Sequence, residues 1–268
     1  MAIASRRCEE ALARGHIYRF LSTAFAYPVP VGYRTLQAEL SQEAASARAL
    51  LRWPVKEFDT VCDALRNCAR ERFEAEHVAA FGHTTAADVP AYEARYGARH
   101  LFQETQCMAD VAGFYRAFGF EEADAPRERP DHIAVELEFM HVLAIKEAVA
   151  LSHGWVEQAE VCRDAQAQFL RDHLARWTPT FLGRLADFGK GGILAMLAGV
   201  TIACLQADCR GFGFQIEKGE LDLAPIDHEP VGSDFSCGIA ECGGEPTLIG
   251  ITRRAPGEEE SSVKEEME

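Results

Sequence analysis

A short polar turn in the middle of the chain carries most of the side chains that could do chemistry. The run Glu128-Arg-Pro-Asp-His132 comes directly before the most apolar stretch of the sequence. One interpretation is structural, because Pro130 would end a loop and Asp131 would cap the next helix by accepting its free N–H groups. His132 would then take the first helical position, where the helix dipole disfavours an imidazolium. A cation-prone residue there favours a functional interpretation of the turn.

Two Glu-x-x-His pairs suggest a different chemistry. Glu74 and His77 form one pair, and Glu138 and His141 form the other. Residues three apart share one face of a helix and can bind one metal ion, as they do in ferritin-like di-iron bundles. Such a site needs a further carboxylate from each of two other helices, and the predicted helix 105–118 offers only Asp110. A di-iron helical-bundle enzyme is therefore the alternative interpretation.

The cysteines allow a third site. Cys204 and Cys209, and likewise Cys237 and Cys242, form two equally spaced pairs that would bind zinc or an iron–sulfur centre. Cys204 lies in an apolar run, however, which favours a plain buried thiol. The chain has nine cysteines, and this odd number at irregular positions is typical of reduced thiols rather than of a disulfide framework. Metal at these cysteines stays open, and we expect no cofactor.

The elements that must position these side chains are predicted to be helices. From Ser5 to about Gly211, apolar residues recur at spacings of three and four, and strand-like alternation is almost absent. Pro28 and Pro30 end the first helix, and Pro54 suits the first turn of the third. The predicted helices cover residues 5–27, 33–51, 54–81, 105–118, 132–152, 155–176, 179–188 and 191–208. We therefore expect an all-α, single helical-bundle domain over residues 1–210.

The chain changes character after that domain. Residues 211–268 hold nine of the 21 glycines and four of the 11 prolines, without an amphipathic repeat. Six of the last 12 residues are glutamates, which makes this end too polar to join a core. The sequence therefore predicts an irregular, Gly/Pro-rich extension over 211–268 that ends in a disordered acidic tail.

Composition limits the class of partner. The 268 residues are 48% hydrophobic and carry a net charge of −15. Such acidity argues against a nucleic-acid binder, which needs a basic face for phosphates, and favours a basic partner. Glu9 and Glu10 follow Arg6 and Arg7, where an export signal would begin its apolar stretch. The longest apolar run, 191–205, is shorter than the roughly 20 residues that span a bilayer. We expect a cytoplasmic protein without membrane insertion.

Several motifs together resemble the TorD/DmsD/NarJ family of redox-enzyme maturation chaperones. The turn Glu128-x-Pro-Asp-His132 is followed by Glu136-Leu-Glu-Phe-Met140, and Tyr92-Glu-x-x-Tyr-Gly97 lies upstream, in the order of that family. Further similar motifs are Ala109-Asp-Val-x-Gly-Phe-Tyr-x-x-Phe-Gly119 and Tyr18-x-x-Leu21. The resemblance covers about residues 10–205 and is most specific over 92–143. Arg129, between the glutamate and the proline, is similar to the NarJ-like and dehydrogenase-chaperone branches.

The resemblance implies an all-helical chaperone without enzymatic activity. Such proteins bind the apo catalytic subunit of a molybdopterin oxidoreductase, often through its twin-arginine signal peptide, until the cofactor is inserted. The resemblance transfers a recognition loop to Glu128, Pro130, Asp131 and His132, with Tyr92 and Glu93 as weaker candidates. It also implies a monomer or a dimer that exchanges helices.

The residue types suit that role. Each carboxylate of the turn would bind an arginine of the peptide through two parallel hydrogen bonds, a geometry that lysine cannot reproduce. Tyr115 and Phe139, with Phe114 and Phe118, would line a groove for the apolar part of the peptide. Besides the di-iron enzyme, a helical scaffold for another basic partner remains an alternative. The sequence does not identify the client.

Overall fold

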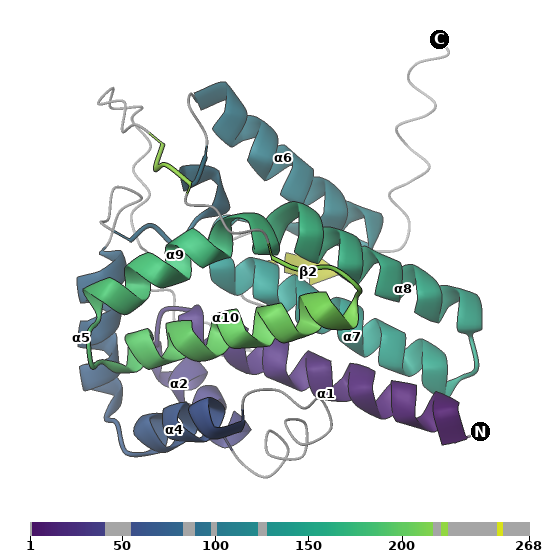
Figure 1. The fold of residues 1–268 in the computed structure, drawn as a ribbon, viewed down its shortest axis with the longest axis horizontal. Coiled ribbons are helices and arrows are strands. Elements are labelled where there is room, and N and C mark those ends of the chain that lie inside the picture. The colour runs from purple at the N-terminus through teal and green to yellow at the C-terminus, as the bar shows by residue number, and fades with distance from the viewer. Residues whose placement is uncertain are drawn as a thin grey trace.

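The structure, a computed structural model, is a bundle of helices with short irregular connections (Figure 1). It describes residues 2–40, 55–82, 89–97, 101–122, 128–216, 221–224 and 251–253. The α-helices are α1 (Ala2–Phe25), α2 (Pro30–Glu39), α4 (Val55–Arg66), α5 (Arg70–Phe81), α6 (Leu101–Ala117), α7 (Ile133–Ser152), α8 (Val156–Phe169), α9 (Ala175–Phe188) and α10 (Ile193–Gly211). The short elements are η1 (Glu93–Arg95), η2 (Leu170–Leu174), β1 (Phe120–Glu122) and β2 (Ile251–Arg253). The predicted all-α class is confirmed.

The core is built around α7, whose side chains are buried along most of its length. α1 runs beside it and makes the most extensive helix–helix contact of the described residues (Figure 1). Gly15 permits this approach, because a Cβ atom there would lie 2.8 Å from Cδ1 of Ile145. The two helices bury apolar stripes that include Leu21 on α1 and Leu137 on α7.

The predicted helix 54–81 is wrong in one respect, because the structure divides it into α4 and α5. Asn67 turns its side-chain amide back to the carbonyl oxygen of Asp63, at 2.8 Å, and so competes with the helical hydrogen bonds. The Tyr33 hydroxyl of α2 donates to the carbonyl oxygen of Cys68, also at 2.8 Å. A carbonyl in the turn between α4 and α5 is therefore satisfied from another helix.

The opposite error occurs between α8 and α9. Separate helices are predicted over 155–176 and 179–188, but the helix continues from Val156 to Phe188 through the five-residue π-helical turn η2. Pro179 lies inside α9, after that wider turn. Packing of this helix, which buries Trp177 and Phe181, outweighs the loss of one backbone hydrogen bond.

α10 is the one described helix that is long and apolar enough to cross a membrane, judged by length and composition. In this structure it is a core helix, with 56% of its most apolar window buried. It packs against α9, α4 and α5.

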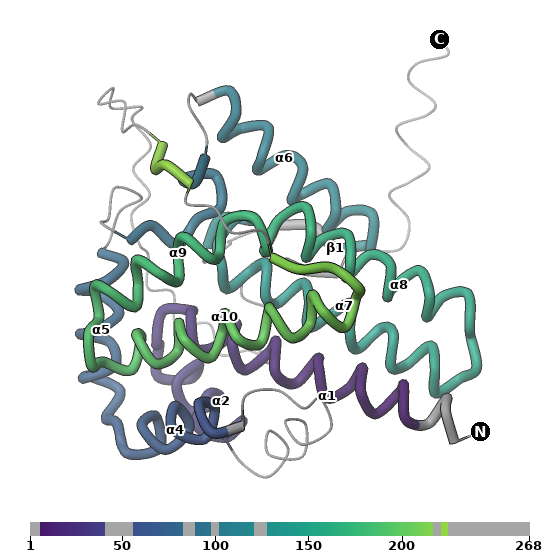
Figure 2. Tube along the Cα trace, viewed as in Figure 1, coloured from purple at the N-terminus to yellow at the C-terminus, as the bar shows by residue number. Residues whose placement is uncertain are grey.

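Parts of the extension are described. Residues 221–224 lie beside segment 89–97, where the yellow-green and blue tubes meet in Figure 2. β2 pairs antiparallel with β1, which places Thr252 opposite Glu121. This two-stranded pair is a small exception to the strand-free expectation. α10 ends at Gly211, next to the predicted boundary, and the division of the chain into two units stays a prediction.

Candidate functional site

Segment 89–97 and the turn 128–132 meet as a short antiparallel bridge. Tyr92 lies opposite His132. The N–H of Glu93 donates to the carbonyl oxygen of Asp131 at 2.8 Å, and the N–H of Ile133 donates to that of Ala91 at 2.9 Å. The candidate residues from two distant parts of the sequence therefore converge at the start of α7.

The cap of α7 differs from the expected one. His132, not Asp131, is the N-cap, and its Nδ1 accepts the N–H of Ala134 at 3.2 Å. Burial lowers the pKa of His132 to about 4, although the nearby carboxylate of Asp131 opposes that shift. A neutral imidazole can accept a hydrogen bond at the positive end of the helix dipole, so the dipole argument against His132 does not apply.

Asp131 is completely buried and already paired. Its two carboxylate oxygens accept Nε and Nη2 of Arg129 at 2.9 and 2.8 Å, and the N–H of Ala94 at 3.2 Å. Asp131 is thus the fixed acceptor of an arginine from its own chain. Both Asp131 and His132 are buried, so direct contact of these two residues with a partner stays a prediction.

The outer part of the turn remains accessible. Glu128, Arg129, Pro130 and Tyr92 are each half-buried. The Tyr92 hydroxyl donates to Glu128 at 3.1 Å, and the Arg129 guanidinium stacks over the Tyr92 ring with 4.8 Å to its centroid. Burial raises the pKa of Glu128, while the hydrogen bond from Tyr92 opposes that shift. The solvent therefore meets a carboxylate, an aromatic face and one guanidinium.

The aromatic residues expected to line a groove are core residues. Tyr115 and Phe139 are buried, with ring centroids 4.8 Å apart, and the Tyr115 hydroxyl donates to the carbonyl oxygen of Pro130 at 2.7 Å. Helical spacing of aromatics more often marks a core, and the part of both residues in a groove for the peptide stays a prediction. Phe114 and Phe118 are partly buried against that core.

An acidic cluster lies beneath the turn, consisting of Glu93, Asp131 and Glu136. Glu93 contacts Nδ1 of His173 at 2.9 Å, and Trp177 donates its Nε1–H to Glu136 at 3.1 Å. Oε1 of Glu136 is buried without a hydrogen-bond partner among the described residues. Burial, and then the charge of Glu93, raise the pKa of Glu136 well above its usual range.

Sequence reasoning missed the roles of Glu136, His173 and Trp177. A carboxylate in the first turn of a helix is ordinary, so its position alone did not indicate that Glu136 is buried. The available signal was the apolar surrounding sequence, in which a charged residue must find partners or a proton.

The di-iron alternative finds no support in the described residues. The Glu-x-x-His pairs lie on separate helices, α5 and α7, and both imidazoles bond to backbone. His77 Nε2 lies 3.0 Å from the carbonyl oxygen of Phe25, and His141 Nδ1 lies 2.9 Å from that of Gly15. Glu74 accepts Arg70 Nη1 at 2.7 Å. No group of three or more His, Cys, Asp or Glu side chains in these parts of the chain is arranged to hold a metal ion.

The cysteine site stays a prediction. Cys204 and Cys209 are buried on α10, and burial raises the pKa of Cys209 to about 12. A thiol of that kind is not predisposed to ligate metal. Cys237 and Cys242 lie outside the described residues.

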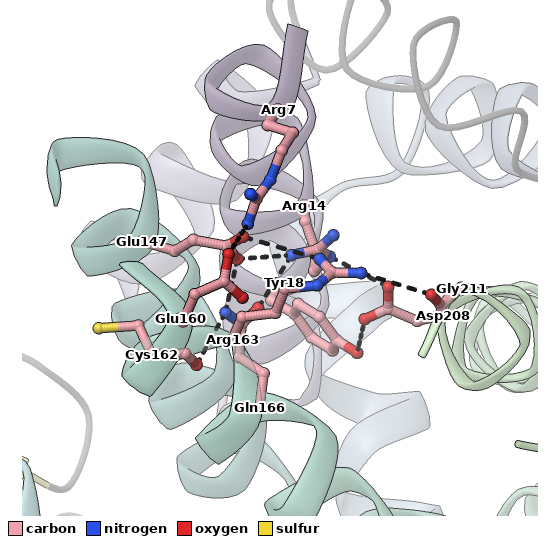
Figure 3. A network of polar contacts seen from close by, with 10 residues as sticks. All are labelled: Arg7, Arg14, Tyr18, Glu147, Glu160, Cys162, Arg163, Gln166, Asp208 and Gly211. Atoms are coloured by element: carbon pink, nitrogen blue, oxygen red, sulfur yellow. Dashed lines mark hydrogen bonds and ion pairs between the residues drawn. The ribbon is translucent and has the colours of Figure 1, made fainter. Parts of the chain in front are cut away.

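A second buried polar cluster, which we call the Arg14 network, joins four helices (Figure 3). Arg14 of α1 donates to Asp208 of α10 and to Glu147 of α7, each at 3.0 Å. It also donates to Gln166 of α8 at 3.1 Å, and Tyr18 donates to Asp208 at 2.8 Å. Burial alone would lower the pKa of Arg14, but Asp208 and Glu147 outweigh it and raise the pKa. The network contains no residue of the turn.

Comparison with known proteins identifies the family. The family model described as "Nitrate reductase delta subunit" matches residues 36–183. The chain is 36% identical over 116 residues to the selenate reductase assembly chaperone protein of Thauera selenatis, covering 43% of this chain and 58% of that relative. It is 30% identical over 179 residues to the perchlorate reductase assembly chaperone protein of Dechloromonas aromatica (strain RCB), covering 65% of this chain and 78% of the relative.

A chaperone protein TorD of Vibrio cholerae is 32% identical over 92 residues, which cover 34% of this chain and 40% of that protein. These relatives are named as chaperones and not as enzymes. Since the family model matches more than half of the chain, and the perchlorate reductase relative is matched over most of its length, the chain belongs to the nitrate reductase delta subunit family of the NarJ/TorD type.

Proposed function

We propose that this protein is a cytoplasmic assembly chaperone for a molybdopterin oxidoreductase. It binds the apo catalytic subunit through the twin-arginine signal peptide of that subunit and keeps it receptive until the cofactor is inserted. Membership of the family carries this proposal, because the named relatives are assembly chaperones for selenate and perchlorate reductases. The protein itself needs no cofactor, and its action consists of binding and release.

The outer turn supplies the chemistry that would recognise the arginines of the peptide. Arg129 already shows that a guanidinium fits between the Tyr92 ring and a carboxylate of this turn, at 4.8 Å from the ring centroid. A client arginine would approach Glu128, because this carboxylate is half-buried whereas that of Asp131 is fully buried. Arginine binds such a site in two parallel hydrogen bonds and stacks on the ring, whereas lysine offers neither.

The structure changes how this proposal should be tested. Replacing Asp131 with Asn and His132 with Ala would remove the partner of Arg129 and the cap of α7 together. A loss of binding in that double variant would then reflect damage to the fold as much as loss of recognition. Glu128 is the better target, because its contacts lie at the edge of the protein.

The decisive experiment is calorimetric titration with a synthetic signal peptide of the molybdopterin oxidoreductase precursor encoded nearest to this gene. We expect E128Q to weaken binding about 10- to 100-fold, as for loss of a hydrogen bond to a charged group. The control is E157Q, an exposed glutamate of α8 with the same change in charge. A twin-lysine peptide should bind wild type as weakly as the normal peptide binds E128Q. Equal affinities of E128Q and E157Q for the twin-arginine peptide would contradict this site.

Oligomeric state is a separate part of the proposal. Family resemblance suggests a monomer or a helix-exchanged dimer. Light scattering on the purified protein, with and without the signal peptide, would distinguish the two.

A further inference from the structure

Residues 221–224, which we call the strap, lie along segment 95–97 and join it through one antiparallel β-bridge. The N–H of Gly97 donates to the carbonyl oxygen of Asp222, and the N–H of Ala224 donates to that of Arg95, both at 2.8 Å. Leu223 lies opposite Tyr96 in this antiparallel bridge. The extension is therefore hydrogen-bonded to the helical domain as a peptide ligand would be in β-augmentation.

Side chains of the strap are arranged to fit this edge. The Leu221 side chain lies over Gly97, whose φ of +79° disfavours any residue with a Cβ. Leu221 and Leu223 pack against the hydrophobic core, and Ala224 is buried. Asp222 is exposed and contributes only its backbone.

Arg95 marks the end of the edge. This buried arginine donates Nη2 to the carbonyl oxygen of Ala224 at 2.9 Å and contacts Glu104 through Nη1 at 3.3 Å. Its Nε is buried without a hydrogen-bond partner among the described residues. If the strap left, Arg95 would lose a carbonyl acceptor, and the edge would offer one N–H and one C=O to an incoming peptide.

The edge and the candidate site share one piece of chain. Tyr92 of segment 89–97 pairs with His132 of the turn, and Tyr96, four residues on, pairs with Leu223 of the strap. A client peptide held at the turn thus has an extended docking edge within the same segment. The sequence limits the strap, because Pro225 follows Ala224 and has no N–H to continue the pairing.

We propose that the edge at Arg95–Gly97 is a docking site for an extended apolar segment of the client, and that the strap is a tethered competitor for it. This inference rests on the proposed function for the identity of the client. The fitting partner is a short extended segment with apolar side chains at alternate positions and a carbonyl that faces Arg95. Because the tether holds the strap at an effective concentration in the mM range, a client must bind elsewhere as well to displace it.

A fluorescent peptide of residues 217–227, added to the full-length protein, tests the edge without any client. A224P removes the N–H that bonds to Arg95, whereas D222A changes only an exposed side chain and serves as the matched control. We expect the peptide to bind A224P at least 10-fold more tightly than it binds wild type or D222A. Equal binding of the peptide to the three folded proteins would overturn the proposal that the strap competes for the edge.

A second variant answers the case in which A224P does not fold. A protease recognition sequence inserted between Gly219 and Glu220 allows the protein to fold intact and be cut afterwards. After cutting, we expect the C-terminal fragment to exchange with the labelled peptide, and a peptide carrying the Ala224→Pro change to fail to exchange. A cut protein that excludes both peptides would overturn the edge as a docking site.

The signal peptide of the nearest molybdopterin oxidoreductase precursor separates the two proposals. Tighter binding to A224P than to D222A, by 10-fold or more, supports displacement of the strap by the client. The same affinity for both shows that the client does not use the edge. Absence of client binding to every variant, together with exchange of the 217–227 peptide, removes the proposed function and leaves the edge intact.

Discussion

The Arg14 network and the acidic cluster are both buried, but their charges are balanced in opposite ways. In the Arg14 network, Glu147 and Asp208 each bond to Arg14 at 3.0 Å, and Arg163 approaches Glu147 at 3.6 Å. In the acidic cluster, Arg129 bonds to Asp131, Glu93 contacts His173, and one oxygen of Glu136 has no partner among the described residues.

This difference indicates that the Arg14 network fixes the fold, whereas the acidic cluster is suited to change. Paired charges that link α1, α7, α8 and α10 fix the positions of those helices, because removal of one member leaves another buried and unpaired. The acidic cluster relieves its excess of negative charge by holding a proton, as the raised pKa of Glu136 indicates. The family motifs at Tyr92–Gly97 and Glu128–His132 meet at the acidic cluster, next to the strap, whereas Tyr18 of the first motif belongs to the Arg14 network.

Removing Arg14 from its network should have the largest effect on stability. We expect R14M to lower the free energy of unfolding by about 3–5 kcal/mol, because Glu147 and Asp208 would be left in the core with less positive charge. Urea unfolding measures the change. R6M, which removes an exposed arginine of the same helix, is the control and should have little effect. A loss of unfolding free energy below about 1 kcal/mol in R14M would show that the network does not fix the positions of these helices.

Removing one carboxylate charge from the Arg14 network should have a smaller effect on stability. E147Q keeps the size of the side chain but loses the ion pairs with Arg14 and Arg163, so we expect a loss of about 2 kcal/mol. E160Q changes a half-buried glutamate that pairs with Arg7 near the surface, and it should stay within about 0.5 kcal/mol of wild type. If the two variants unfold at the same urea concentration, the distinction between fully buried and partly exposed pairs fails here.

A glutamate-to-glutamine substitution in the acidic cluster should instead stabilise the protein, and the gain in stability should depend on pH. Glu136 holds its proton in the folded state above the usual value of 4.5, so its contribution to stability is complete below that pH and decreases as the pH rises. E136Q keeps an acceptor for Trp177 and cannot ionise. Relative to wild type, we expect it to gain stability with rising pH, by at most roughly 1.4 kcal/mol per pH unit.

Urea unfolding at pH 5, 7 and 9 would reveal this trend, with E157Q as the exposed control. A constant difference between E136Q and wild type across that range would mean that Glu136 titrates normally. The proton would then not explain how the acidic cluster tolerates three carboxyl groups.

Sequence reasoning predicted those features that depend on local pattern. α7 begins at Ile133 and ends at Ser152, against a prediction of 132–152, because its apolar stripe is unbroken. The division between α4 and α5 was missed because one of the contacts at the break comes from Tyr33, which is distant in sequence. The continuation through Pro179 was missed because packing of Trp177 and Phe181 outweighs a local propensity.

The candidate site divides in the same way. Its residues could be selected from the sequence by type and by resemblance, but the burial of Asp131 depends on segment 89–97 folding over the turn. The pairing of Asp131 with Arg129, two residues away, follows only once Asp131 is shielded from water. The pairing of the strap with Arg95–Gly97 joins residues more than a hundred positions apart and has no local signal.

The π-helical turn η2 has a consequence for how this domain can vary. It places one more residue in a turn than the regular helix needs, so α9 is rotated about its axis relative to a straight continuation of α8. His173, which reaches Glu93, lies within that turn. Deleting a single residue between Leu170 and Leu174 would restore ordinary winding and leave the downstream side chains close to their present directions, because the wider turn already accommodates one extra residue. Deleting one residue elsewhere in this helix would instead rotate every downstream side chain by about 100°. The loss of one residue is therefore expected to be tolerated better at this turn than on either side of it.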